Sequence, residues 1–169
     1  MTLSKAMQVY HDALNKGDIQ RAYRSILGFM SELRTELEQK YPDYVFSQVY
    51  PGYMDMSYFA ITPMELRTVK LKVALVYLHE ANRFELWLSA NNRNLQKKWI
   101  DVLSQSGDMQ YRVSEVGVGI DSIVEYIVHV QPNFDARAAL KQSLEMNTLR
   151  FIKDMETRIL DVQKENEHA

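Results

Sequence analysis

The sequence predicts an α+β fold, in which a mainly antiparallel mixed sheet is packed against long N-terminal and C-terminal helices. Apolar residues recur at intervals of three and four near both ends of the chain, the spacing typical of helices that cover a core. The central part is rich in β-branched and aromatic residues, which favour strands. Because 169 residues with 46% hydrophobic side chains can build one core, we expect a single domain over residues 1–169, with residues 163–169 as a frayed polar tail.

Two helices are expected at the N-terminal end. Apolar side chains in residues 3–16 follow helical spacing, and Gly17 lies where a residue in the left-handed conformation would end that helix. A second amphipathic helix begins at Asp18 and ends before Pro42. Its other face carries charged residues that include Glu32 and Glu36, and we interpret this face as solvated.

The strands are expected to begin near Tyr44. A turn at residues 50–52 separates a first strand from a second at residues 53–61. Thr62 is followed by proline and, three positions on, by Glu65, which predicts one helical turn capped by Thr62. The next strand, residues 69–79, is apolar on both faces at its centre, as a central strand should be.

A hairpin should follow this central strand. A two-residue turn at Ala81 and Asn82 would pair Tyr77 with Leu86 and, further along, Leu75 with Leu88. Glu85 and Trp87 would then share the opposite face of the strand.

The C-terminal third should contain two helices and two strands. Asn91 or Asn92 can cap a helix that ends at Gly107, and a strand at residues 111–116 would complete a crossover. A strand at residues 123–130 should place Val124, Tyr126, Val128 and Val130 on one face and Glu125 and His129 on the other. The last long helix should begin at Asn133 or Asp135.

Composition and charge exclude several classes of protein. Twenty Lys and Arg against 22 Asp and Glu give a net charge of −2, so we do not expect nucleic acid as a partner. The absence of cysteine excludes disulfides, thiolate metal sites and cysteine nucleophiles. We find neither an apolar run long enough for a membrane span nor an export signal, and therefore expect a cytoplasmic protein with no membrane partner.

The usual catalytic and cofactor motifs are also missing. The histidines His11, His79, His129 and His168 are far apart in sequence, which predicts no metal site. The serines lack the flanking glycines of a nucleophile elbow. Residues 117–119 read Gly-Val-Gly but lack the third glycine of a dinucleotide loop, and we predict a turn there and no cofactor.

One alternative gives the chain a catalytic role. The predicted order of a helix, a three-stranded meander, a helix and a strand resembles the core of restriction-endonuclease-like nucleases. That resemblance implies a magnesium site built from Asp55 and Glu85. The chain departs from the family at Trp87, where the Glu-x-Lys motif would have lysine.

Binding is the simpler hypothesis. Five tyrosines fall within residues 41–58, and such amphipathic rings suit a pocket or an interface as well as strand packing. We name as candidate binding residues Tyr50, Tyr53, Asp55, Tyr58 and Trp87.

The run YPGYMDMSYFAITPMELRTVKLKVALVYLHEANRFELWLSANNRNLQKKW at residues 50–99, together with DSIVEYIVHVQPNFD at 121–135, resembles an uncharacterised family of bacterial single-domain proteins of about this length. The resemblance implies no catalytic residue. The part from Phe84 onward also resembles, more weakly, a domain of unknown function appended to nuclease-like proteins.

We therefore expect a non-enzymatic cytoplasmic module that binds a small molecule or a protein, and that forms a homodimer through an exposed strand or helix face. The alternative is a metal-dependent phosphodiesterase, or its inactive relative, that uses Asp55 and Glu85.

Overall fold

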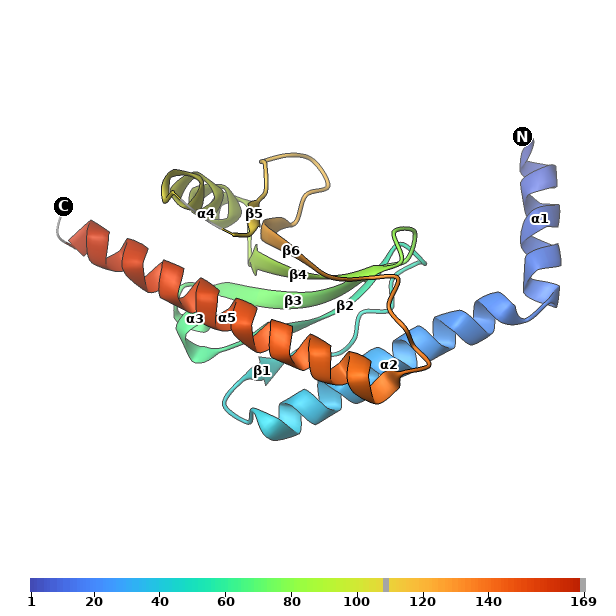
Figure 1. Ribbon diagram of the computed structural model, residues 1–169. Helices are drawn as coiled ribbons and strands as arrows, with labels where there is room; N and C mark the ends of the chain where they lie inside the picture. Colours follow the sequence, from blue (N-terminus) through green and yellow to red (C-terminus); the bar gives the residue numbers. More distant parts are fainter. Residues whose placement is uncertain (108–109, 168–169) are drawn as a thin grey trace.

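The computed structural model describes residues 1–107 and 110–167, which form five helices and six strands (Figure 1). The helices are α1 (Leu3–Asn15), α2 (Asp18–Lys40), α3 (Met64–Thr68), α4 (Arg93–Gln105) and α5 (Arg137–Glu167). The strands are β1 (Val45–Phe46), β2 (Met56–Thr62), β3 (Leu71–Leu78), β4 (Arg83–Ala90), β5 (Arg112–Val113) and β6 (Ser122–Val130).

The strands form one sheet in the order β1-β2-β3-β4-β6-β5, and the neighbouring strands pair antiparallel. The expected α+β architecture is thus confirmed. The predicted crossover through α4 also exists, because β5 runs parallel to β4. However, β6 inserts between them, so the two parallel strands are not neighbours. Among the described residues, no helix has the length and hydropathy that a membrane span requires.

Helices α2 and α5 lie together across one face of the sheet, as expected, and enclose the core (Figure 1). Leu75 and Leu86 of the central strands and Leu144 of α5 are fully buried. Phe29 of α2, which the sequence analysis did not single out, is also fully buried, and its ring lies 6.0 Å from that of Phe84. Aromatic packing therefore helps to hold α2 against the sheet, in addition to the aliphatic contacts that the sequence predicted.

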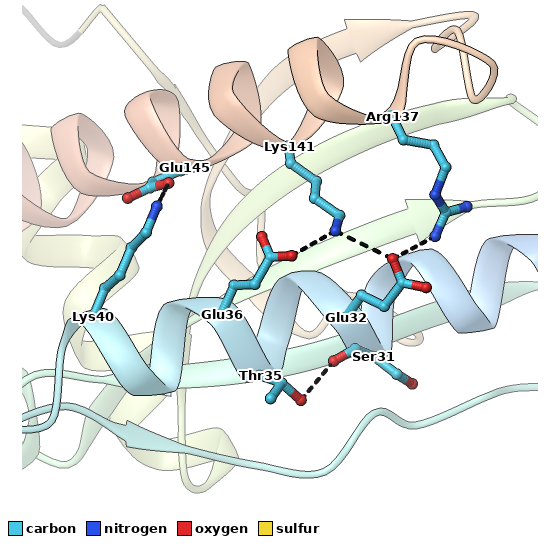
Figure 2. A network of polar contacts seen from close by, with 8 residues as sticks. All are labelled: Ser31, Glu32, Thr35, Glu36, Lys40, Arg137, Lys141 and Glu145. Atoms are coloured by element: carbon cyan, nitrogen blue, oxygen red, sulfur yellow. Dashed lines mark hydrogen bonds and ion pairs between the residues drawn. The ribbon is translucent and has the colours of Figure 1, made fainter.

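The charged face of α2 is not simply solvated, which corrects the sequence interpretation. Figure 2 shows Glu32 and Glu36 facing α5, where Arg137 lies 2.6 Å from Glu32 and Lys141 lies 2.6 Å from Glu36. Lys141 also reaches Glu32 at 3.2 Å. We call these residues, together with the Lys40–Glu145 pair, the α2–α5 ion-pair ladder. The ladder links the facing sides of α2 and α5.

The predicted hairpin exists, but its register is wrong by two residues. Tyr77 pairs with Phe84, and Leu75 pairs with Leu86. The turn contains residues 79–82, in which Asn82 adopts a positive φ of 47° and accepts a hydrogen bond from the Tyr77 hydroxyl (2.8 Å). An even shift keeps each side chain on its predicted face, so Glu85 and Trp87 remain opposite the core.

A β-bulge corrects the expected faces of β6. Phe84 pairs with His129, whereas the adjacent Glu85 pairs with Ile127, so one extra residue enters β6. His129 therefore faces α5 and contacts Ser143 (2.7 Å), while Val130, expected on the core side, is exposed. A one-residue insertion reverses the alternation beyond it, and the sequence carries no glycine or proline there to mark it.

Several helices and strands begin or end at residues other than those predicted. Strand β2 begins at Met56, and β5 is shorter than the predicted strand at residues 111–116. Pro63, not Thr62, is the N-cap of α3, which has no side-chain capping bond. Helix α4 is capped by Asn92, one of the two predicted residues. Helix α5 begins at Arg137 and continues to Glu167, so residues 163–167 are helical where a frayed tail was expected; residues 168–169 lie outside the described residues.

Helix α1 projects away from the body of the protein (Figure 1). The predicted amphipathic helix exists, but its apolar residues Leu3, Met7 and Tyr10 are exposed. Gly17 ends the turn to α2 with a φ of 79°, as predicted for a left-handed residue. The uncovered stripe is therefore available for contact with another molecule.

Candidate functional site

The face of the sheet opposite α2 and α5 is only partly covered. The first turn of helix α4, which contacts β4, β5 and β6, borders this face through Arg93 and Gln96. Beside it, over β2, β3 and β4, a cavity of about 320 Å³ remains. We call this cavity the open-face hollow; the lining residues used below are Tyr58, Ala60, Lys72, Ala74, Trp87 and Gln96.

Two alanines form the floor of the open-face hollow. Ala60 of β2 lies directly opposite Ala74 of β3, which in turn lies opposite Trp87 of β4. Their methyl groups leave space above the sheet that larger side chains would fill. Tyr58 lies two strands across and two residues along from Trp87, or roughly 12 Å between Cα atoms by standard strand spacings. The two aromatic side chains thus flank a floor of small residues.

Both aromatic walls are fixed by contacts outside the hollow. The Trp87 indole Nε1–H donates a hydrogen bond to Glu85 Oε2 (2.6 Å), and Arg83 Nε donates to Glu85 Oε1 (2.7 Å). Glu85 is only 3% exposed, so its charge is neutralised by Arg83 and held in place. Tyr58 packs against the ring of Tyr50 at 5.1 Å. The side chains are therefore ordered before any ligand arrives, which lowers the entropic cost of binding.

The polar rim of the hollow contains one unpaired charge. Arg93 lies 3.1 Å from Asp121, so these two charges compensate each other. Gln96 donates to the backbone carbonyl groups of Ile120 (2.8 Å) and Ser122 (3.0 Å). Lys72 forms neither a hydrogen bond nor an ion pair with any residue that the structure describes. Its ammonium group is available to a ligand.

The tyrosines of residues 41–58 separate into different environments. Tyr41 and Tyr44 stack at 5.6 Å beside α5, where burial and the hydrogen bond to Glu145 raise the pKa of Tyr41 to about 12. Tyr58 lines the open-face hollow, and Tyr50 does not line it but packs against the Tyr58 ring. Tyr53 is 90% exposed and does not line the hollow. The structure thus brings together Tyr58, Trp87 and, behind Tyr58, Tyr50.

Asp55, the remaining candidate binding residue, lies in the turn before β2. Its carboxylate accepts a hydrogen bond from the Tyr53 backbone N–H (2.8 Å), which lowers the pKa of Asp55. The strand register places it three residues along and two strands across from Glu85, roughly 14 Å between Cα atoms. The structure therefore does not bring the two carboxylates of the nuclease alternative together. Within residues 1–107 and 110–167, no three potential ligands of the His, Cys, Asp or Glu type gather around a metal site.

A serine and a histidine do meet in the structure, but in a buried setting. Ser57 Oγ lies 2.8 Å from His79 Nε2 and 2.5 Å from the Pro51 carbonyl oxygen. The hydroxyl donates to the carbonyl, so the serine must accept from the histidine and is not activated by it. Tyr23 donates to the same carbonyl group (3.0 Å). These contacts anchor the loop before β2 to the body of the protein.

A larger groove of about 760 Å³ follows the α2–α5 ion-pair ladder. Its charged side chains are already engaged with each other, as in the Lys141–Glu36 and Lys40–Glu145 pairs. A ligand there would have to displace an ion pair before it gained a new contact. The open-face hollow offers an unpaired cation and ordered aromatic walls instead, so we take it as the candidate site.

The sequence analysis missed Ala60, Lys72 and Ala74. Alanine and lysine are common on a strand face, and they define a hollow only once three strands are aligned. The one available signal was the small size of Ala74 within the apolar run of the central strand, where a larger side chain would be expected. The need for a correct alignment across β2, β3 and β4 explains why pattern alone did not reveal the floor.

Comparison with known proteins gives one match. The sequence profile of a family described as "Domain of unknown function (DUF7000)" matches residues 3–159, which is most of the chain. No curated protein and no solved structure matches the chain.

Proposed function

We propose that this chain, which belongs to the DUF7000 family, is a binding module that takes a small molecule into the open-face hollow. The observation that carries the proposal is the hollow lined by Ala60 and Ala74 beside Tyr58 and Trp87. Apolar surface left open on one face of a sheet, beside ordered polar groups, is typical of ligand sites.

The dimensions of the hollow support a ligand of modest size. Its volume of about 320 Å³ lies at the lower end for small-molecule pockets. If each non-hydrogen atom needs about the volume of one water molecule, the hollow accommodates on the order of ten such atoms. A folded protein partner would need a larger, flatter surface, so a small molecule is the better fit.

The module acts by binding. The phosphodiesterase alternative receives no support from the geometry, because Asp55 and Glu85 are far apart and Glu85 is already occupied by Arg83 and Trp87. The cytoplasmic location stays a prediction from the sequence.

Nuclear magnetic resonance of the ¹⁵N-labelled protein tests the proposal. The chain has two tryptophans, and each contributes one indole N–H signal. Trp87 lines the hollow, whereas Trp99 lies on the buried side of α4 and is absent from the lining. In a screen of small aromatic and aliphatic compounds, we expect ligands to shift the Trp87 signal and leave the Trp99 signal in place.

A variant that fills the hollow supplies the control. Ala74→Leu adds three carbon atoms to the floor on the side of the sheet away from α2 and α5, and should abolish the ligand-induced shifts. Ala81→Leu makes the same substitution in the exposed β3–β4 turn and should bind as the wild type does. Ligands that shift both indole signals equally, or that bind Ala74→Leu unchanged, would show that the hollow is not the site.

A further inference from the structure

We infer that the ligand of the open-face hollow is an aromatic acid, a molecule with a flat apolar body and a single anionic group that reaches Lys72. This inference rests on the proposed function and adds to it the chemical class of the ligand. It follows from the charges around the hollow and from the positions of the two aromatic walls.

The charges that line the hollow do not cancel. Arg93 and Asp121 form an ion pair at 3.1 Å, so their charges compensate each other. Glu85, which accepts the hydrogen bond of the Trp87 indole, is paired with Arg83 at 2.6 Å. Lys72 remains, and without a ligand its charge is compensated by solvent alone. A bound molecule that displaces this water must offer an acceptor to the ammonium group, and an anion is the most favourable acceptor.

The position of Lys72 orients the anionic group. Lys72 lies on β3 two residues from Ala74, so both side chains point to the same face, roughly 7 Å apart along the strand. Ser89 of β4 lies directly opposite Lys72 and also lines the hollow. The anionic group should therefore lie at the Lys72–Ser89 end, while the flat body rests on Ala60 and Ala74.

The aromatic walls determine the shape of the rest of the ligand. Tyr58 and Trp87 line the hollow together with the methyl groups of Ala60 and Ala74, and an aromatic lining favours a flat, apolar body over a branched or highly hydroxylated one. A cationic ligand would be repelled by Lys72 and would meet no unpaired carboxylate among the described lining residues. A neutral ring would leave the ammonium group partly desolvated and without a partner.

A matched series of indole compounds tests the ligand class. Indole-3-acetate, indole-3-acetamide and tryptamine share one ring system and carry a negative charge, no charge and a positive charge. Titration of each compound, followed by the Trp87 indole signal, should rank the affinities in that order. Lys72→Met removes the charge but keeps much of the aliphatic chain, and should weaken indole-3-acetate about tenfold while leaving indole-3-acetamide nearly unchanged. Lys98→Met, on the exposed side of α4, should change neither affinity.

The outcomes separate this inference from the function on which it rests. If indole-3-acetamide binds as tightly as indole-3-acetate, and Lys72→Met has no effect, the acidic class is wrong although the hollow still binds ligands. If none of the three compounds moves the Trp87 signal, the aromatic-acid class is overturned, and the wider screen with Ala74→Leu decides whether the hollow is a site. If Lys98→Met weakens indole-3-acetate as much as Lys72→Met does, the preference reflects overall charge, and the assignment to Lys72 fails.

Discussion

At the scale of single residues, Glu156 carries the largest upward shift of a carboxyl pKa in the structure as described. It lies on α5 near Glu65 of α3, and burial together with the neighbouring carboxylate raises the pKa of Glu156 from 4.5 to about 7. In the unfolded chain the carboxyl group loses its proton at lower pH. The native state therefore binds more protons between these two pKa values, and stability falls as the pH rises through this window.

Replacement of Glu156 tests this account. Glu156→Gln keeps the shape of the protonated carboxyl group and cannot ionise, so it should stabilise the protein at about pH 8 and change its stability little at about pH 5. Urea unfolding at the two pH values measures the difference. Glu165→Gln, at an exposed position of the same helix, is the control and should lack this pH dependence. An equal effect of Glu156→Gln at both pH values would contradict the raised pKa.

His79 should have the opposite effect on stability. Burial lowers its pKa from 6.5, and the nearby Asp55 charge opposes this only in part. The unfolded chain then binds more protons than the native state, so the contribution of His79 is lost as the pH falls below about 6.5. An NMR titration of the imidazole should give a pKa below 6.5. A value at or above that of an exposed histidine would show that the Ser57–His79 contact is open to water.

At the scale of elements, the central strands should contribute most of the stability. Leu86 of β4 is fully buried between the sheet and the two long helices. Leu86→Ala should cost about 2–5 kcal/mol of unfolding free energy, the range for a leucine truncated in a core. Leu160→Ala, on α5 at a position that is 45% exposed, should cost much less. Similar losses in both variants, measured by urea unfolding, would mean that the core is not where the structure places it.

The α2–α5 ion-pair ladder should contribute far less than this packing. Lys141 binds Glu32 and Glu36 across the helix pair, yet both glutamates are about half exposed. Water and salt screen such pairs, so Lys141→Met should cost about 0.5–1 kcal/mol, and the cost should shrink at high salt. A double-mutant cycle between Lys141 and Glu36 measures the coupling. A salt-independent loss of several kcal/mol would contradict the surface position of the ladder.

Local rules predicted which elements form, but not their alignment. Helix caps such as Asn92 and Gly17 were recognisable because capping chemistry is local. The hairpin register was missed because it depends on a hydrogen bond between Tyr77 and Asn82. The bulge in β6 was missed because its cause is pairing with β4, which no local pattern records. Local residue preferences therefore determine whether a segment forms a helix or a strand. Tertiary contacts determine how the strands align.

At the scale of the whole molecule, α1 bears on the predicted homodimer. Leu3, Met7, Tyr10 and Leu14 follow the same spacing from either end of the helix. In an antiparallel pair, Leu3 would meet Leu14 and Met7 would meet Tyr10, as a two-fold interface requires. Leu3, Met7 and Tyr10 are 77%, 56% and 57% exposed, and so few side chains from each helix cover less than the roughly 1,200–2,000 Å² of a stable interface, so we expect a weak dimer.

Sedimentation equilibrium tests this expectation. The wild-type protein should show concentration-dependent association, and Met7→Lys should shift it to monomer because a charge would enter the apolar contact. Val9 is as exposed as Tyr10 but lies on another side of α1, so Val9→Lys should associate as the wild type does. A single monomeric species at high concentration would contradict dimerisation through α1.

The sequence analysis identified only some of the residues of the candidate site. The sequence analysis named Tyr58 and Trp87 because aromatic side chains on a strand are candidate binding residues wherever they occur. Their convergence, and the roles of Ala60, Ala74 and Lys72, depend on three strands that align side by side with no helix above them. A hollow forms where no other side chain or helix fills the space above the sheet. A local sequence pattern does not record this absence of packing.

The location of a bound ligand is the most direct test of the account. Selective ¹³C labelling of alanine methyl groups allows nuclear Overhauser effects to be measured between a bound ligand and each methyl. We predict contacts from indole-3-acetate to the methyls of Ala60 and Ala74, the floor of the open-face hollow. Contacts to Ala138, which lines the groove along the ion-pair ladder, or to Ala6 of α1, without contacts to Ala60 or Ala74, would contradict the central claim.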